Sequence, residues 1–306
     1  MDSKTLLISA MVALTLAYLA RWVVIARARL AAGGHGSHEA VRPTTLQVFI
    51  GFVTNFFDTL GIGSYAPTTA MFRAWHLVPD EQIPGTLNVG HVVPTVVQAV
   101  IFTQLVEVEF TTLALMLAAA ATGAWLGAGV VAGMRRRTVQ VAMGVALLAA
   151  AGIMLLQLGG LVPGGGEALA LSGWKLGVGL SVNLVLGALM TLGIGLYAPC
   201  MILISLLGMN PTAAFPIMMG SCAFLMPVGS MRFIAKNAYN LRAAVGLALG
   251  GPVAVLIAAF IVKSLPLLYM RWLVVIVVLY TASSMLAAAA RNRAATLTSA
   301  RPVATS

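Results

Sequence analysis

Residues 60–67 read Leu-Gly-Ile-Gly-Ser-Tyr-Ala-Pro, and residues 192–199 read Leu-Gly-Ile-Gly-Leu-Tyr-Ala-Pro. The same offset of 132 residues superimposes Pro79 on Pro211, so the match extends beyond the octapeptide and indicates an internal duplication. Both copies lie in long apolar runs, where two glycines and a proline break a helix because they remove side-chain packing and one backbone donor. Paired breaks of this kind in corresponding halves indicate the binding site of a secondary transporter.

The composition is that of a polytopic membrane protein. Of the 306 residues, 60% are hydrophobic and 8% are charged, and the mean hydropathy is +0.98, values far from those of water-soluble domains. The net charge of +10 comes from a few basic residues, mostly at the ends of apolar runs, so it indicates membrane topology and not a nucleic-acid-binding face. Cys200 and Cys222 lie in apolar runs without metal-ligand spacing, which is typical of buried free thiols.

The apolar runs divide the chain into two halves behind one leading helix. Residues 5–25 predict a retained helix, because no small-residue cleavage site follows them. Further runs occur at about 45–73, 84–106, 110–133, 139–158, 173–206, 211–231, 243–262 and 268–290. We expect an N-terminal transmembrane helix with a cytoplasmic linker at 1–43, a first repeat at 44–158, an external loop at 159–172, a second repeat at 173–290, and a disordered cytoplasmic tail at 291–306.

The basic residues predict the orientation. The stretches expected to be cytoplasmic are 21–42, Arg135 to Arg137, Arg232 to Arg242 and the tail, whereas Glu107 to Glu109 and the loop at 159–172 are expected outside. One straight span at 45–73 would leave three crossings between two cytoplasmic loops, which is impossible. The run of about 29 residues can instead form two half-helices of about 20 Å that return to the same side.

Repeating this arrangement at 173–206 predicts an all-α polytopic membrane protein of two inverted repeats. Each repeat is a re-entrant broken-helix hairpin followed by three transmembrane helices, and one extra helix precedes them. Lys263 and Arg271 then flank an external turn, against the usual charge rule.

Few polar side chains lie in these runs. Asp58 precedes the first break by three residues, and an ionisable group at that depth costs about 2.5 to 3.5 kcal/mol on insertion scales. We expect it either to couple a proton to transport or to brace the broken helix. Its counterpart in the second half is Met190. Asn55, Thr59 and Thr191 are expected as interhelical hydrogen-bonding groups near the breaks or as contacts to substrate.

His91 lies within an apolar run, close to Asn88, and the corresponding part of the second half contains Ser221. A histidine there can titrate, bind an anion when protonated, or donate to a carbonyl. We consider Asn88, His91 and Ser221 candidates for substrate binding. No further histidine or carboxylate stands at metal-ligand spacing and no Walker sequence occurs, so we expect no metal, no cofactor and no ATP hydrolysis.

The breaks can also bind an anion without any basic side chain. A half-helix that begins near the membrane midplane has free backbone N–H groups and a partial positive charge at its N-terminus. Gly61, Gly63, Gly193 and Gly195 would let a substrate approach this backbone closely. Opposed breaks would place two such helix ends around one central site.

The duplicated glycine-rich break, followed by Pro67 and Pro199, in a chain of about 300 residues with a basic central turn, resembles the sulfite exporter TauE/SafE family, of the organosulfonate/sulfite anion permeases. The resemblance covers about residues 45–290. It implies a secondary carrier of sulfur-containing anions in the bacterial inner membrane. It places Gly61, Gly63, Ser64, Tyr65, Gly193, Gly195 and Tyr197 near the translocation site, although the tyrosines stand where the family is usually richer in glycine.

The sequence is compatible with three classes of function. The duplication and the scarcity of buried cations favour a secondary transporter of a small oxyanion, such as sulfite or an organosulfonate, that works by alternating access and is either proton-linked or not. An anion channel, or a carrier of a small carboxylate, could use the same fold. A membrane enzyme, or an assembly factor without a site, is the third possibility, and it is disfavoured because no nucleophile and base occur at a plausible spacing. The expected partners are the anion and the lipid bilayer, and a homodimer is left open.

Overall fold

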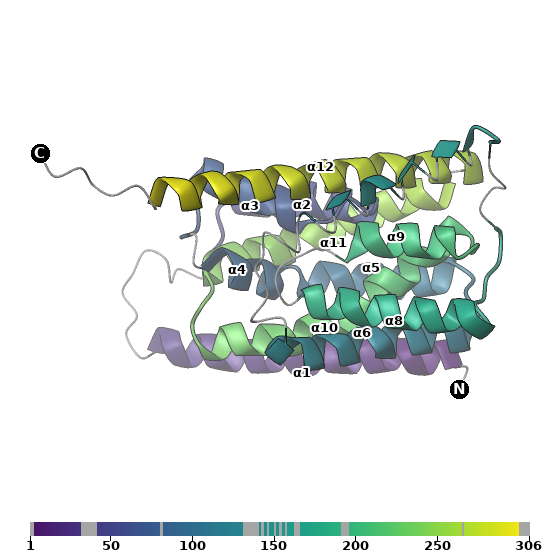
Figure 1. Ribbon diagram of the computed structural model, residues 1–306. Coiled ribbons are helices and arrows are strands. Elements are labelled where there is room, and N and C mark those ends of the chain that lie inside the picture. Colours follow the sequence, from purple (N-terminus) through teal and green to yellow (C-terminus); the bar gives the residue numbers. More distant parts are fainter. Residues whose placement is uncertain are drawn as a thin grey trace, which may run out of the picture.

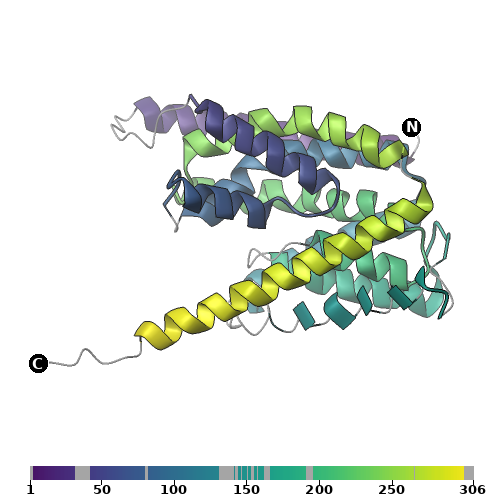
Figure 2. The same ribbon diagram turned by 90° about the horizontal axis from the view of Figure 1, so that it is seen from above.

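A computed structural model gives the fold. It describes residues 3–31, 42–79, 82–130, 166–190, 196–264 and 266–299, with isolated positions between 141 and 161. The helices are α1 (Ser3–Ala31), α2 (Thr45–Thr59), α3 (Tyr65–Ala74), α4 (Ile83–Gly90), α5 (Val92–Leu105), α6 (Phe110–Val130), α8 (Gly173–Met190), α9 (Tyr197–Leu206), α10 (Ala214–Ala235), α11 (Leu241–Ser264) and α12 (Leu267–Ser299), and a 3-10 turn at Pro211–Ala213 precedes α10. They form an elongated bundle, across which α12 runs obliquely (Figure 1, Figure 2). The described residues contain no strand, so the expected all-α class is confirmed.

Five helical segments of the described part are long and apolar enough to cross a membrane. These are Ser3–Ala31, Ile83–Leu105, Gly173–Met190, Pro211–Ala235 and Leu241–Val262. Their number and apolarity support the expected multi-pass membrane protein, while the expected total of seven full spans is not reached in the described part. Helix α12 continues to Ser299, so the expected beginning of the polar tail at Arg291 falls inside a helix.

The first octapeptide breaks its run as expected. Helix α2 begins at a capping box, in which the Thr44 side chain accepts from the backbone of Gln47 and the Gln47 side chain accepts from the backbone of Thr44. It ends at Thr59, because Gly61 and Gly63 take φ values of +94° and +85°, which residues with a side chain rarely adopt. Helix α3 then returns beside α2, so the two form a helical hairpin (Figure 2).

The second octapeptide lies between two helices in the same way. Helix α8 ends at Met190 and α9 begins at Tyr197, the counterpart of Tyr65 at the start of α3. Residues 191–195, and with them Thr191, Gly193 and Gly195, lie outside the described residues. Helices α8 and α9 contact each other, as α2 and α3 do.

The expected single run at 84–106 contains a second kind of break. Helix α4 ends at Gly90 and α5 begins at Val92, with His91 between them. Pro94 has no N–H to offer the carbonyl of Gly90, so the backbone is under-satisfied here. The Tyr18 hydroxyl of α1 donates to the neighbouring carbonyl of Val89 at 3.0 Å, and the extra N-terminal helix thereby supports the break.

The most extensive contacts between helices join the first half to the second half. Helix α2 packs on α11 of the second half, and α8 packs on α6 of the first half. Glycines allow both approaches: a Cβ on Gly250 would lie 2.0 Å from the carbonyl oxygen of Val48, and one on Gly187 would lie 2.1 Å from that of Ala120. Because these neighbours are backbone atoms, a side chain at either glycine would force the helices apart.

Hydrogen bonds tie the turns together at both ends of the bundle. At one end, Arg29 donates to the carbonyl of Ile234 and to the Asn237 side chain, and Arg242 donates to the carbonyl of Arg42. At the other end, the backbone N–H of Glu109 donates to the carbonyl of Leu169. Arg29, Arg42 and Arg242 thus lie at one end. The opposite end, which carries Glu107 and Glu109 and is called the acidic end below, also carries Lys175.

Glu109 also caps helix α6. Its carboxylate accepts from the backbone N–H groups of Thr111 and Thr112 and from the Thr112 hydroxyl, at 2.6–2.8 Å. Hydrogen bonds from Thr111 and then Thr112 lower the pKa of Glu109 to about 2.

Candidate functional site

A polar stripe on α4 and α5 forms the centre of the candidate site. Asn88, His91, Thr95 and Gln98 follow one another at spacings of three, four and three residues, which puts them on one helical face. His91, Thr95 and Gln98 are buried. Their side chains face the residues of the two octapeptide breaks.

Tyr65 and Asn88 make the first of these contacts. The Tyr65 hydroxyl, in the first turn of α3, donates to Oδ1 of Asn88 at 3.1 Å, and the Asn88 amide donates to the carbonyl of Pro84. The Tyr65 ring also lies beside His91, with ring centroids 6.0 Å apart. The start of α3 is thereby held to the end of α4.

His91 lies between α2 and α3. Its Nδ1 is 3.0 Å from Oδ1 of Asn55, and its Nε2 is 3.2 Å from the Thr68 hydroxyl. Asn55 donates its amide N–H to the carbonyl of Gly51, so its Oδ1 is free to accept and Nδ1 of His91 carries the proton. The Thr68 hydroxyl can donate to Nε2 or to the carbonyl of Ser64, 2.7 Å away. A neutral and a doubly protonated His91 therefore both fit, by rotation of one hydroxyl.

Asp58 lies at the end of α2 and is 3% exposed. Its carboxylate accepts from Nε2 of Gln98 at 2.9 Å, and the hydroxyl and N–H of Ser64 and the hydroxyl of Tyr197 also face it. Hydrogen-bond donors thus surround this carboxylate. A buried carboxylate compensated only in this way is costly, so it is a candidate for proton uptake.

Gln98 connects the two breaks. Its amide N–H groups donate to Asp58 and, at 3.0 Å, to the Thr59 hydroxyl, while its carbonyl accepts from the Tyr197 hydroxyl at 2.9 Å. Tyr197 begins α9, and Thr95 lies beside its hydroxyl. One side chain of the first half therefore joins the end of α2, directly before the first octapeptide, to Tyr197 of the second octapeptide.

The glycines of the first break have different surroundings. A Cβ on Gly61 would lie 2.5 Å from Sδ of Met201 on α9, so this glycine packs against the second half. A Cβ on Gly63 would meet no atom of the described residues within 4 Å. Open space next to the backbone is therefore found at Gly63, just before the N-terminus of α3.

The second half adds mainly apolar and sulfur-containing side chains. Ser221, expected near the substrate, is buried beside Asn183, whose amide lies 3.5 Å from its hydroxyl and donates to the carbonyl of Met116. Within the described residues, the hydrogen bonds of Ser221 and of Asp58 involve different partners. Cys222 lies 3.5 Å from Sδ of Met190, and both cysteines are free and buried.

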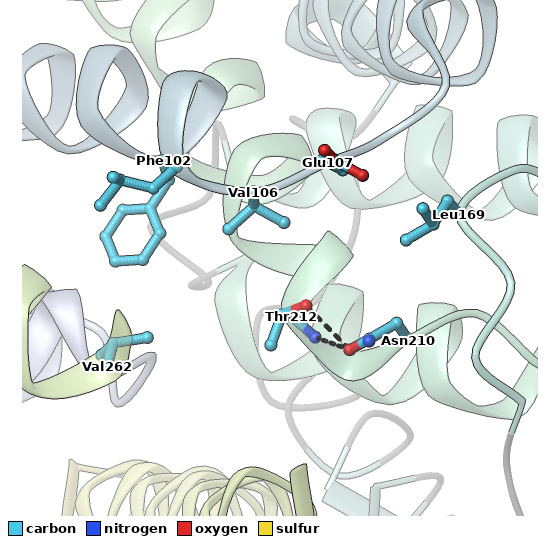
Figure 3. Close-up of a pocket in the computed structure, with 8 residues that line it drawn as sticks. Phe102, Val106, Glu107, Leu169, Asn210, Thr212 and Val262 are labelled. Carbon is cyan, nitrogen blue, oxygen red and sulfur yellow. Dashed lines mark hydrogen bonds between the residues drawn. The ribbon is translucent and has the colours of Figure 1, made fainter. Parts of the chain in front are cut away.

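A cavity of about 240 Å³ lies at the acidic end of the bundle (Figure 3). It is lined by Phe102, Leu105, Val106, Glu107, Leu169, Asn210, Thr212 and Val262. Phe102 stands one helical turn beyond Gln98 and stacks on Phe215, with centroids 5.0 Å apart and planes at 20°. Phe102 thus lies along α5 between the polar stripe and the rest of this cavity.

Sequence reasoning missed Thr95 and Gln98. The sequence does indicate them, because Thr95 and Gln98 continue the helical spacing of polar residues that starts at Asn88 and His91. The spacing could not reveal Tyr197 as a partner of Gln98, since the two residues are 99 positions apart.

The bundle of apolar helices and its buried polar stripe at broken helices define the class as a multi-pass membrane protein of the transporter type. The chain matches the family model described as sulfite exporter TauE/SafE over residues 1–154. The protein belongs to this family. The matched region contains α1 and the whole polar stripe. It ends at residue 154, whereas the resemblance expected from the sequence covers residues 45–290 and so includes the second half. No curated protein and no solved structure matches the chain.

Proposed function

We propose that the protein is a secondary transporter of a small sulfur-containing oxyanion, such as sulfite or an organosulfonate, which binds between the two octapeptide breaks. The observation that carries the proposal is the pair of contacts from Gln98 to Asp58 and to Tyr197, because it joins one break of each half in a buried polar site. The family adds the substrate class.

The arrangement of helices favours alternating access between inverted repeats. The hairpin of α2 and α3 and that of α8 and α9 occupy equivalent places in the two halves. The packing of α2 on α11 corresponds to the packing of α8 on α6, as expected when two repeats are related by an approximate twofold axis. Two re-entrant hairpins that enter from opposite sides would account for both features.

The site would bind the anion through backbone and hydroxyl groups. Helices α3 and α9 begin at Tyr65 and Tyr197, and neither has a side-chain cap on its first N–H groups. Uncapped N–H groups and the positive end of the helix dipole favour an anion. Gly63 leaves space there, and Ser64 adds a hydroxyl.

The anion would reach this site from outside through the cavity beside Glu107. The stacked rings of Phe102 and Phe215 would close the path in the present state and part during the transport cycle. The apolar wall of the cavity would favour an anion that carries an organic group, whereas Glu107 would slow the entry of multiply charged anions.

Asp58 gives a reason for proton coupling. An ionised carboxylate in a buried site opposes the binding of an anion, and a protonated one does not. Transport of the anion together with a proton would remove this repulsion. Under this proposal the protein moves a substrate and performs no catalysis, and it resides in the inner membrane of a bacterium.

Flux measurements in reconstituted vesicles test the proposal. A carrier should show saturable uptake of labelled sulfite or methanesulfonate and counterflow, in which unlabelled substrate inside accelerates entry of the label. Uptake that does not saturate and shows no counterflow would indicate an anion channel instead. Preference for acetate over both sulfur anions would indicate a carrier of small carboxylates.

A further inference from the structure

We propose that Gln98 relays the protonation of Asp58 to Tyr197 by turning its side-chain amide, and that this relay makes the Tyr197 hydroxyl available to the transported anion. The inference rests on the proposed function. It assigns Gln98 as a positioning residue that links the proton to the anion.

The present hydrogen bonds have one consistent direction. An ionised Asp58 can only accept, so the amide N–H groups of Gln98 must face it. Thr59 gives its hydroxyl proton to the carbonyl of Asn55, 2.7 Å away, and accepts from the same amide. The carbonyl oxygen of Gln98 then faces Tyr197, whose hydroxyl must donate to it.

A proton on Asp58 reverses this order. The protonated carboxyl becomes a donor, and the group that it faces must then accept. A half-turn of the Gln98 amide brings its carbonyl to Asp58 and its N–H groups to Tyr197. The Thr59 hydroxyl, which then faces the Gln98 carbonyl, must turn from the carbonyl of Asn55 and donate to that of Gln98. The Tyr197 oxygen now accepts, so its own proton is free for another acceptor. No covalent bond other than the O–H bond on Asp58 forms, and the proton comes from water.

The released hydroxyl lies where an anion is expected. Tyr197 is the first residue of α9, and the uncapped N–H groups of that helix start lie next to it. The added donor strengthens anion binding only when Asp58 holds a proton. Proton and anion therefore favour each other's binding, as reciprocal linkage requires.

Other titratable groups surround Asp58. The phenols of Tyr65 on α3 and Tyr197 on α9 and the thiol of Cys222 on α10 all interact with its charge. Phenols and thiols ordinarily keep their protons at neutral pH, so they do not compete with the carboxyl as acceptors. His91, on the same side of α5, uses both ring nitrogens on Asn55 and Thr68.

Binding of methanesulfonate tests the relay, because this anion keeps one charge over the whole pH range. In the wild type, affinity should rise as the pH falls, by at most about tenfold per pH unit for one linked proton. Gln98→Leu and Tyr197→Phe should each reduce this dependence, and the double variant should reduce it no further. If the single variants lose affinity by the same factor at every pH, the residues are structural and the relay is wrong.

Infrared difference spectra between acidic and alkaline pH test the relay without any ligand. The carboxyl band of Asp58 should appear together with a shifted glutamine amide band and a changed tyrosine band. Gln98→Leu should remove the amide change, and Tyr197→Phe the tyrosine change. An Asp58 band without the other two would overturn the relay even if transport is proven. Absent anion flux with all three bands present would instead refute only the proposed function.

Discussion

Replacing Gly63 by leucine should abolish transport while the protein still folds. Gly63 has φ +85°, where a residue with a Cβ costs about 1–2 kcal/mol, and a Cβ there meets no atom within 4 Å in the part of the chain that the structure describes. The loss of stability should therefore come from the backbone alone. The leucine methyl groups would extend into the space that we assign to the anion.

Gly63→Ala is the matched control, because it carries the same backbone cost without the larger side chain. Thermal unfolding in detergent should show a similar small loss for both variants, and vesicle flux should be lost only with leucine. Normal flux in Gly63→Leu would remove this glycine from the site. Equal loss of flux in both variants would show that backbone strain, and not filled space, is responsible. We expect Gly195→Leu to behave like Gly63→Leu.

Three further predictions concern topology, coupling and access. Cysteines placed in the loop at 159–172 should react with an impermeant label from outside the cell, and labelling from the cytoplasmic side alone would contradict the inverted arrangement. Asp58→Asn should still bind substrate in a binding assay but lose the response of vesicle flux to a pH gradient, whereas His91→Ala should weaken binding more than coupling; an unchanged response in Asp58→Asn would make Asp58 structural. Phe102→Ala should open the path at the acidic end and raise the access of an impermeant thiol reagent to a cysteine at Gly63, and unchanged access would exclude the stacked rings as the barrier.

Local chemistry made several features predictable. Apolar runs specify helices whatever their neighbours are, so the all-α membrane class followed from composition. The conformational needs of Gly61 and Gly63 are equally local, and both have the positive φ expected at a break. The family followed from the motif and is confirmed. The roles of the expected site residues stay predictions.

Other features depend on packing between distant segments. The break at His91 was missed because a lone proline in an apolar run is tolerated in many membrane helices. The contact of Ser221 with Asn183 on α8 likewise follows from packing, and its expected place near the substrate stays a prediction.

The sequence by itself determined which runs are helical and that the two octapeptides interrupt them, since these depend on each residue's own volume, hydropathy and backbone freedom. Only the tertiary structure decided that Gln98 stands between Asp58 and Tyr197. A glutamine in an apolar helix needs hydrogen-bond partners, but its own chemistry does not specify which ones. Its partners are the groups that the packing of the two halves against each other brings within about 3 Å.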